Sequence, residues 1–348
     1  MEILRPITLD DLEQLVELTS MAGHGLTSLP NDAELLHRRV RDSVRDFSRS
    51  DEAPQGQSYL FVLEDLSTGR IVGTSGVVSK VGGFEPFYAY RMQMSHHKSA
   101  VLKVQKEVQA LHLVAEHNGP SEIGSLFLAP DKRRGGNGRL LSLGRFLYIA
   151  EHAQRFEPTV IAEMRGVIDA EGGSVFWDAL GRHFFDVDFP VVDYMSAVDK
   201  RFIADLMPKH PIYIPLLPPA AQEVIGQVHQ NTCPALRLLL EQGFCDSGMV
   251  DIFEAGPVLT VQRDQIATVQ QSRRVKVTEI SDSEFGPADH LIAAVQDGFR
   301  VSAGPLAATE LGVRLWARTA LALGIKVGQC VRVAPLRPDT GSNQVQSH

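Results

Sequence analysis

The turn at residues 133–138 constrains the fold of this chain more than any other part of its sequence. It follows a short apolar run at residues 121–128, which is typical of a strand, and precedes a segment whose apolar residues recur at helical spacing. A strand, a glycine-rich turn and a helix N-terminus form a phosphate-binding arrangement, because the first N–H groups of a helix lack partners within it and glycines admit an anion closely. The sequence therefore predicts a phosphate-binding loop at this turn.

The spacing of the glycines distinguishes between classes of phosphate-binding loop. The pattern Gly-x-x-x-x-Gly-Lys-Ser/Thr of P-loop nucleotidases is absent from the turn. A dinucleotide fingerprint requires a third glycine, whereas Gly136 and Gly138 are followed by an arginine and two leucines. The pattern that fits is Arg-x-x-Gly-x-Gly, formed by Arg133, Gly136 and Gly138. It resembles the pyrophosphate loop of the GNAT superfamily of acyl-CoA-dependent N-acyltransferases, and an ordinary basic turn is the alternative.

The composition disfavours several other classes of protein. With 44% hydrophobic and 22% charged residues the chain is typical of globular proteins, and its formal net charge of −8 does not favour a nucleic-acid partner. No apolar run approaches the ~18 residues of a membrane span, and the first residues lack the apolar core of a signal peptide. Three widely spaced cysteines indicate a reducing compartment without a disulfide framework. We therefore expect a cytoplasmic protein with no nucleic-acid partner, no membrane partner and no metal site.

The order of the predicted elements indicates an α+β fold, with a GNAT-like mixed twisted sheet flanked by helices. A second hallmark of that superfamily, Asn-x-x-x-Ala-x-x-Leu-x-x-x-x-Gly-Phe, occurs at residues 231–244. A degenerate version of its ending at residues 174–184 hints at two acyltransferase-like halves. Residues 81–120 are predicted to be an insertion near the acyl site, and residues 185–200 to be a strand and a turn.

The same reading divides the chain into four parts. Residues 1–200 are predicted to be a GNAT-like half that binds acyl-CoA, and residues 201–274 a second GNAT-like part that completes the site. Residues 275–337 are expected to form a small β-rich appendage of short strands around a helix near residues 307–323. Residues 338–348 are predicted to be a disordered tail.

Longer blocks narrow the resemblance to one family. Those blocks lie at residues 25–30, 162–169, 206–213, 225–229 and 251–257. Together with the turn they closely resemble the arginine N-succinyltransferase family, and the likeness fades after residue 274. The resemblance implies an acyltransferase of arginine catabolism that moves the succinyl group of succinyl-CoA to the α-amino group of L-arginine. It also implies direct transfer in a ternary complex, with succinyl-CoA as a co-substrate and no tightly bound cofactor.

The resemblance leaves the acceptor and the assembly open. Some members of the family also use ornithine, and some work as paired paralogous subunits, so we expect a homo- or hetero-oligomer. Two further alternatives are an N-acyltransferase acting on another amino acid and a non-catalytic paralogue that binds acyl-CoA. The intact loop argues against the non-catalytic alternative, because a lost cofactor site is expected to erode there.

The resemblance also assigns roles to individual residues. The family's proton donor falls on His229, a residue type that gives or takes a proton near neutral pH, and a surface histidine is the alternative. The family's succinyl-CoA contact falls on Leu126, which we interpret as a main-chain contact. The residues expected to bind succinyl-CoA are Leu126, Leu128, Arg133, Arg134, Gly135, Gly136, Asn137 and Gly138.

The residues that bind the acceptor are harder to predict. A guanidinium pairs best with a carboxylate in fork geometry. Glu163 and Asp169 flank Arg165 and are candidates for this role, although a structural ion pair explains them equally well. Arg165 is a candidate for binding a carboxylate of the succinyl group or of arginine.

Overall fold

The computed structural model describes residues 1–22, 26, 28–49, 53–83 and 85–337. The predicted disordered tail lies outside these residues. The strands are β1 Glu2–Pro6, β2 Ser58–Asp65, β3 Arg70–Val78, β4 Phe87–Ser99, β5 Val104–Glu116, β6 Ser121–Leu128, β7 Thr159–Glu163, β8 Ile212–Tyr213, β9 Cys245–Val250, β10 Pro257–Gln262, β11 Arg273–Ser281, β12 His290–Ala294, β13 Arg300–Gly304, β14 Leu306–Thr309, β15 Gly312–Trp316 and β16 Cys330–Pro335. The α-helices are α1 Leu12–Ser20, α2 Ala33–Ser48, α3 Asn137–Glu151, α4 Val175–Ala179, α5 Arg182–Phe185, α6 Phe189–Val198, α7 Arg201–Leu206, α8 Pro219–Val224, α9 Cys233–Glu241, α10 Ala267–Gln271 and α11 Ala317–Leu323.

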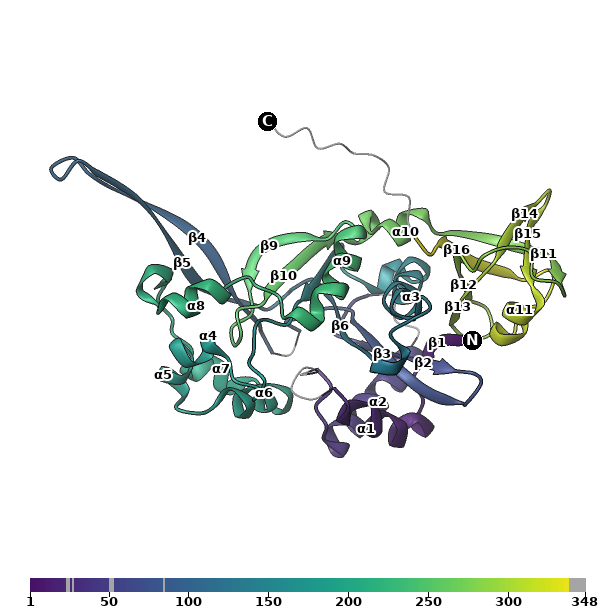
Figure 1. The fold of residues 1–348 in the computed structure, drawn as a ribbon, viewed down its shortest axis with the longest axis horizontal. Helices are drawn as coiled ribbons and strands as arrows, with labels where there is room; N and C mark the ends of the chain where they lie inside the picture. Colours follow the sequence, from purple (N-terminus) through teal and green to yellow (C-terminus); the bar gives the residue numbers. More distant parts are fainter. Residues whose placement is uncertain (23–25, 27, 50–52, 84, 338–348) are drawn as a thin grey trace.

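The strands form one mixed sheet that runs across the molecule (Figure 1). Its order is β14-β15-β11-β16-β12-β13-β1-β2-β3-β6-β7-β10-β9-β4-β5-β8. Near the centre, β6 pairs antiparallel with β3 and parallel with β7. This is the mixed α+β sheet that the sequence predicts. Strands from residues 201–274 and from residues 275–337 extend the same sheet, and the predicted domain boundaries stay a prediction.

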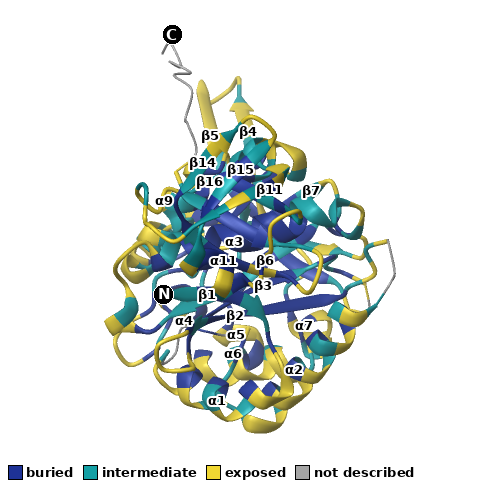
Figure 2. Ribbon diagram, turned by 90° about the vertical axis from the view of Figure 1, so that its right-hand side faces the viewer, coloured by how far each residue is buried: buried dark blue, intermediate teal, exposed yellow. Residues whose placement is uncertain are grey.

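Two layers of helices cover the sheet around β2. Side chains along a strand alternate between its two faces. Phe61 and Leu63 pack with α3, whereas Leu60 and Val62 pack with α1 and α2 on the opposite face. Figure 2 shows α3 buried in the interior, while α1 and α2 present exposed outer faces. The strand–turn–helix unit formed by β6 and α3 is therefore anchored in the core.

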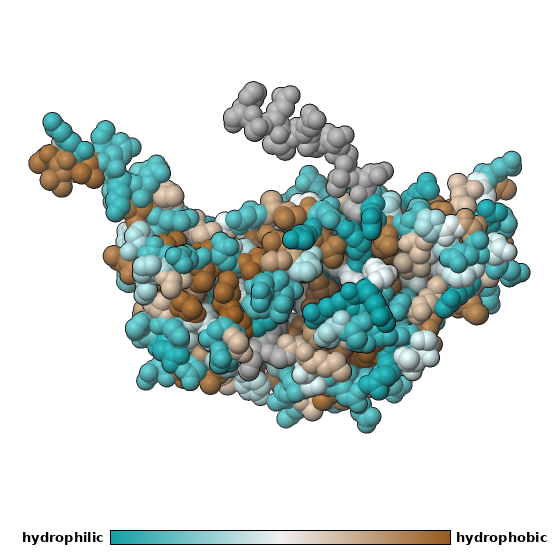
Figure 3. Space-filling view, viewed as in Figure 1, coloured by the Kyte–Doolittle hydropathy of each residue, from teal (hydrophilic) through white to brown (hydrophobic). Residues whose placement is uncertain are grey.

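Residues 87–116 form a long hairpin within the segment predicted to be an insertion near the acyl site. β4 and β5 pair along their whole length, and the hairpin projects from the body of the molecule (Figure 1). At its tip Val101 is 93% exposed and Leu102 is 73% exposed, and Figure 3 shows an apolar patch at the end of the arm. Continuous strand pairing carries the far end of the hairpin away from the body of the molecule, and Phe87 and Tyr88 at its base line the cavity described below.

Residues 189–198 form helix α6 rather than the predicted strand. Pro190 occupies the first turn of this helix, where its missing N–H has no cost and its fixed φ suits the helix. Phe189 and Val192 are buried, and their separation of three residues places them on one helical face. This packing decides the structure of a segment whose sequence alternates only weakly.

The helix predicted near residues 307–323 is confined to α11, because the strands β14 and β15 precede it. In β15, Val313 is 1% exposed and Leu315 is fully buried, whereas Arg314 between them is partly exposed. This alternation has the period of a strand. The prediction of short strands around a helix is otherwise confirmed for this region.

Candidate active site

The turn after β6 builds an anion-binding loop from main-chain atoms. Gly135 and Gly136 have φ angles of 63° and 88°, in the left-handed region that favours glycine, and Gly136 is the N-cap of α3. The main-chain oxygen of Gly136 accepts from the N–H of Leu140 at 3.0 Å. The N–H groups of Gly135, Gly136, Gly138 and Arg139 donate to no other described residue. These amides lie at the positive end of the helix dipole and can receive an anion.

Half of the four cationic side chains beside the loop are already paired with carboxylates. Lys132 Nζ lies 2.8 Å from Asp65 Oδ2, and Arg139 Nη2 lies 2.6 Å from Glu241 Oε2. The hydrogen bond from Lys132 holds the pKa of the Asp65 carboxyl well below its usual range. The loop therefore attracts an anion mainly through its main-chain amides, and less through free cationic side chains.

A β-bulge in β6 lies close to the loop. Two residues of β6, Ser125 and Leu126, lie opposite a single residue of β3, Ser75. Ser125 has a φ of 50°, which is uncommon for a residue other than glycine. On its other side β6 pairs with β7 only at Ser121 and Glu122, within the residues described. Past these two residues the edge of β6 is open on the side of β7, and the bulge lies in this open part.

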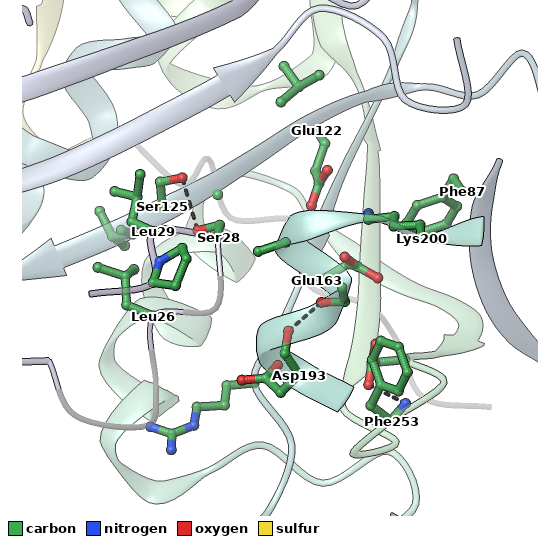
Figure 4. Close-up of a pocket in the computed structure, with 18 of the residues that line it drawn as sticks. Leu26, Ser28, Leu29, Phe87, Glu122, Ser125, Glu163, Asp193, Lys200 and Phe253 are labelled. Carbon is green, nitrogen blue, oxygen red and sulfur yellow. Dashed lines mark hydrogen bonds between the residues drawn. The ribbon is translucent and has the colours of Figure 1, made fainter. Parts of the chain in front are cut away.

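A cavity of about 570 Å³ lies against the open edge of β6. Its lining comes from α2, β6, α6, α9 and the end of β7, with Arg145 contributed by α3. Figure 4 shows Glu122, Glu163 and Lys200 extending into the same part of this cavity. It also shows the hydrogen bond at 3.0 Å from Ser125 Oγ to Ser28 Oγ, which joins the bulge to the segment before α2. The cavity thus brings together segments that are far apart in the sequence.

Carboxyl groups dominate one wall of the cavity. They are Glu122, Glu163, Asp193, Asp251 and Glu254. Burial, aided by the neighbouring charges of Glu122 and Asp251, raises the pKa of Glu163 well above its ordinary value. Burial and the charge of Asp251 raise the pKa of Asp193 to about 7 and that of Glu254 to about 8. Closely spaced carboxylates in a partly desolvated cavity retain protons in this way, and the same repulsion favours binding of a cation.

His229 lies beside this cavity. Its main-chain N–H donates to the main-chain oxygen of Arg165 at 2.9 Å, and Arg165 lines the cavity. The ring Nδ1 accepts from the N–H of Asn231 at 3.2 Å, so the proton of the neutral ring lies on Nε2. Burial and the positive charge of Arg165 lower the pKa of His229. The imidazole is therefore mostly neutral near pH 7, and its Nε2–H can donate a hydrogen bond.

The structure brings some of the predicted site residues together. Leu126, Glu163 and Arg165 line the cavity, and His229 adjoins it through Arg165. Of the residues predicted to bind succinyl-CoA, the following lie outside the cavity lining: Leu128, Arg133, Arg134, Gly135, Gly136, Asn137 and Gly138. These residues belong to the same β6–α3 unit as Leu126. Arg133 folds back along this unit, and its Nε donates to the main-chain oxygen of Leu128 at 3.0 Å.

Asp169 lies outside the cavity lining, and its role as an acceptor ligand stays a prediction. Its Oδ1 accepts from the N–H of Gly173 at 2.5 Å, and its own N–H donates to the main-chain oxygen of Gly173 at 2.9 Å. The carboxylate therefore closes a local turn. The cavity carboxylates that the sequence analysis missed are Glu122, Asp193, Asp251 and Glu254. One signal was available for Glu122, because a charged residue within a short apolar strand needs a specific environment.

Two negative findings concern metals and membranes. Within the described ranges, no group of three or more His, Cys, Asp or Glu side chains is arranged to hold a metal ion. Over the same part of the chain, no helix has both the length and the apolar character needed to cross a membrane.

The mixed sheet, the strand–loop–helix unit and the adjoining cavity define the class of the protein, a GNAT-like acyltransferase. The profile of the family described as "Arginine N-succinyltransferase beta subunit" matches residues 2–268. The chain therefore belongs to the arginine N-succinyltransferase family.

Relatives of the chain match it over almost its whole length. An arginine N-succinyltransferase of Yersinia pestis (strain Pestoides F) is 40% identical over 346 residues, which cover 97% of this chain and 99% of the relative. The arginine N-succinyltransferase subunit beta of Pseudomonas aeruginosa is 41% identical over 336 residues, or 96% of this chain and 98% of the relative. The solved structure of arginine/ornithine succinyltransferase subunit AI from Pseudomonas aeruginosa has a TM-score of 0.88 at 34% identity, and covers 97% of this chain and 99% of that one.

Proposed function

We propose that this chain is an arginine N-succinyltransferase, which transfers the succinyl group of succinyl-CoA to the α-amino group of L-arginine. The observation that carries the proposal is the cavity between the open, bulged edge of β6 and a wall of carboxyl groups, with His229 beside it. The printed names of the relatives support the same reaction. The enzyme acts in arginine catabolism in the cytoplasm, without a tightly bound cofactor.

The donor binds along the β6–α3 unit. The amides of Gly135, Gly136 and Gly138 receive the pyrophosphate of succinyl-CoA, and Arg134 beside them is exposed and adds charge. The pantetheine arm follows the open edge of β6, where main-chain groups lack partners on β7. The thioester then lies at the bulge, where the N–H of Leu126 polarises its carbonyl oxygen. Leu126 acts through its main chain in this arrangement.

Transfer takes place directly between the two substrates. The amine nitrogen of arginine attacks the thioester carbon, the C–S bond breaks, and the departing thiolate of CoA takes a proton. His229 supplies that proton as its imidazolium, which the lowered pKa makes a stronger acid, and the proton that the attacking nitrogen releases restores the charge on the ring. The α-ammonium group must first lose a proton, and a carboxylate whose pKa is raised to about neutrality, such as Asp193, can accept it.

The carboxyl wall recognises the acceptor. Arginine brings a guanidinium and an ammonium group, and both pair with carboxylates in a partly desolvated cavity. Glu163 is the ligand of the guanidinium in this proposal, because it extends into the cavity and neighbouring carboxylates disfavour its ionised form when no cation is bound. Arg165, on the same wall, binds the α-carboxylate. Ornithine is a second candidate acceptor, because its side-chain ammonium carries the same charge and the solved relative is named for both amino acids.

The enzyme works as an oligomer, either of this chain alone or with a paralogous subunit. Two relatives from Pseudomonas aeruginosa are named as subunits, which supports a multi-subunit arrangement. The apolar tip of the β4–β5 hairpin is a further feature that favours a contact with another chain. Light scattering on the purified protein measures the assembly directly, and a strictly monomeric active protein would contradict this part of the proposal.

The activity is tested by following CoA release from succinyl-CoA with a panel of acceptors. L-arginine is compared with L-ornithine and with L-citrulline, which has nearly the shape of arginine but an uncharged side chain. We expect release with arginine, a product carrying succinyl on the α-nitrogen by mass spectrometry, and little release with citrulline. Preference for ornithine would reassign the acceptor. Binding of succinyl-CoA without release with any acceptor would instead identify a non-catalytic acyl-CoA-binding subunit.

A further inference from the structure

The cavity contains a buried arginine that has no role in the mechanism described above. Arg145 of α3 is 2% exposed and lines the cavity. Its Nη1 donates to the main-chain oxygen of Gly124 at 3.1 Å and to that of Gly76 at 3.3 Å. Its Nε donates to the main-chain oxygen of Ser142 at 3.0 Å, and its Nη2 lies 3.5 Å from the Ser142 hydroxyl. Every one of these partners is an uncharged oxygen.

A buried guanidinium with only neutral partners is unusual, because burying an unpaired charge is costly. Arg5 shows the ordinary solution within the same protein: Nη1 lies 2.7 Å from Asp11 Oδ2, and Nε lies 2.5 Å from Glu64 Oε2. Arg145 forms no ion pair with any described residue. Burial lowers the pKa of its guanidinium to about 9, so the side chain is still cationic at neutral pH. The positive charge of Arg145 is therefore present and has no counter-ion among the described residues.

The position of Arg145 indicates which part of a ligand supplies that counter-ion. Gly124, whose main-chain oxygen it binds, directly precedes the bulge residues Ser125 and Leu126. The thioester of the donor lies at this bulge in the proposed arrangement. The terminal carboxylate of a succinyl group is two methylene carbons beyond the thioester carbonyl, a reach of roughly one residue's length of chain. An acyl carboxylate of this length can therefore approach Arg145.

Two other cations of the cavity, Arg39 and Lys200, are less suitable for this anion. Arg39 lies among Glu122 and two aspartates of α2, and Lys200 lies close enough to Glu122 and Glu163 to lower the pKa of both. A succinyl carboxylate placed there would meet the repulsion of the carboxyl wall. Arg145, on the α3 side, has no carboxylate among the groups that affect its pKa.

We propose that Arg145 is the anchor for the terminal carboxylate of the acyl donor, and that it selects dicarboxylic acyl groups such as succinyl over uncharged acyl groups. This inference rests on the proposed function and deepens it. In the empty site the guanidinium is held in place by the carbonyl oxygens of Gly124, Gly76 and Ser142. When the donor binds, the carboxylate supplies the missing negative charge. The acyl group is then fixed at its far end while the thioester lies at the bulge.

The test compares succinyl-CoA with butyryl-CoA, whose acyl chain has the same number of carbons but ends in a methyl group. For Arg145→Gln we expect kcat/KM with succinyl-CoA to fall by at least about thirtyfold, since one partner of a buried charge pair is removed. The rate with butyryl-CoA should change by less than about threefold. Arg145→Lys keeps a cation and should retain most of the preference for succinyl-CoA. This variant tests the proposal if the glutamine variant does not fold.

Arg5→Gln is the matched control, because it removes a half-buried arginine that is already paired within the protein. It is expected to lower stability without changing the ratio between the two donors. An equal fall for both donors in either Arg145 variant would assign Arg145 a purely structural role and overturn the inference. An unchanged ratio in the glutamine variant would overturn it as well. Failure of the proposed function would be recognised separately, because the wild-type protein itself would then release no CoA from succinyl-CoA with arginine.

Discussion

The loop at residues 133–138 and the carboxyl wall of the cavity recognise charge in opposite ways. The loop uses main-chain amides from one short segment, and the nearby cations Lys132 and Arg139 are paired with carboxylates. The wall uses side chains from β6, β7, α6 and residues 251–254. Desolvation and the charges of neighbouring carboxylates raise the pKa values of its carboxyl groups. In the proposed function, donor recognition is thus a local property of the backbone, whereas acceptor recognition depends on the whole fold.

The largest expected effect concerns His229, which lies beside the cavity and far along the chain from the loop. Replacement of His229 by alanine removes the proton donor for the thiolate, so kcat should fall by about 10²–10⁴-fold with little change in the KM of succinyl-CoA. Steady-state kinetics of CoA release measure this, with the exposed His117→Ala as the control. A loss of tenfold or less would remove His229 from the acid–base chemistry.

The second prediction compares a carboxylate that lines the cavity, Glu163, with one that lies outside it, Asp169. Glu163→Gln should raise the KM of arginine by about 10- to 100-fold, because a charge-assisted hydrogen bond is replaced by a neutral one. The KM of succinyl-CoA should stay nearly constant. Asp169→Asn is the matched control, since Asp169 lies in the same stretch of sequence but serves the local turn at Gly173. If Asp169→Asn weakened arginine binding more than Glu163→Gln, the assignment of the acceptor site would be wrong.

A third change addresses the loop. Gly136→Asp places a carboxylate beside the pyrophosphate and forces a side chain into the left-handed φ of 88°, so the KM of succinyl-CoA should rise by about tenfold. The KM of arginine should be unaffected. Gly328→Asp introduces the same residue at a φ of 95° in a remote turn, and it controls for backbone strain. Equal donor kinetics in the two variants would show that the loop does not bind the donor.

The smallest effect concerns stability and pH. The pKa of Glu254 is raised from 4.5 to about 8, so between these values the native state holds a proton that the unfolded state has lost. The free energy of unfolding contributed by this group therefore falls as pH rises through that window. Glu254→Gln still accepts from the N–H of Gly166, whose bond to Glu254 Oε1 is 2.7 Å, but cannot ionise.

Urea unfolding at about pH 5 and about pH 8 measures the pH dependence of stability. The variant should lose less stability between the two pH values than the wild type, by on the order of 1 kcal/mol. The surface substitution Glu223→Gln should leave the difference unchanged. A steeper loss of stability in Glu254→Gln would contradict the burial of a protonated carboxyl group at this position.

Features that depend on local signals could be predicted from the sequence. The strand, the loop and the helix at residues 121–151 were predicted because glycine spacing and apolar periodicity are local signals. Glu163 and Arg165 were found as candidates because they lie in a block shared with a known family. Asp169 was predicted from the same block, but its carboxylate is already used by a turn.

The remaining parts of the site depend on packing that a sequence does not display. Asp193 reaches the cavity only because residues 189–198 form a helix, and the alternation of that segment suggested a strand. Arg145 looks like one more residue of an apolar helix until the structure shows that its partners are carbonyl oxygens. In both cases tertiary contacts, and not local preference, decide where the charge lies.

A crystal structure of the protein with CoA and L-arginine tests the central claim most directly. We expect the pyrophosphate on the amides of residues 135–139, the sulfur next to Leu126 and within reach of His229, and the guanidinium of arginine on Glu163. Clear density for CoA away from the loop, or for arginine outside the carboxyl wall, would contradict the account.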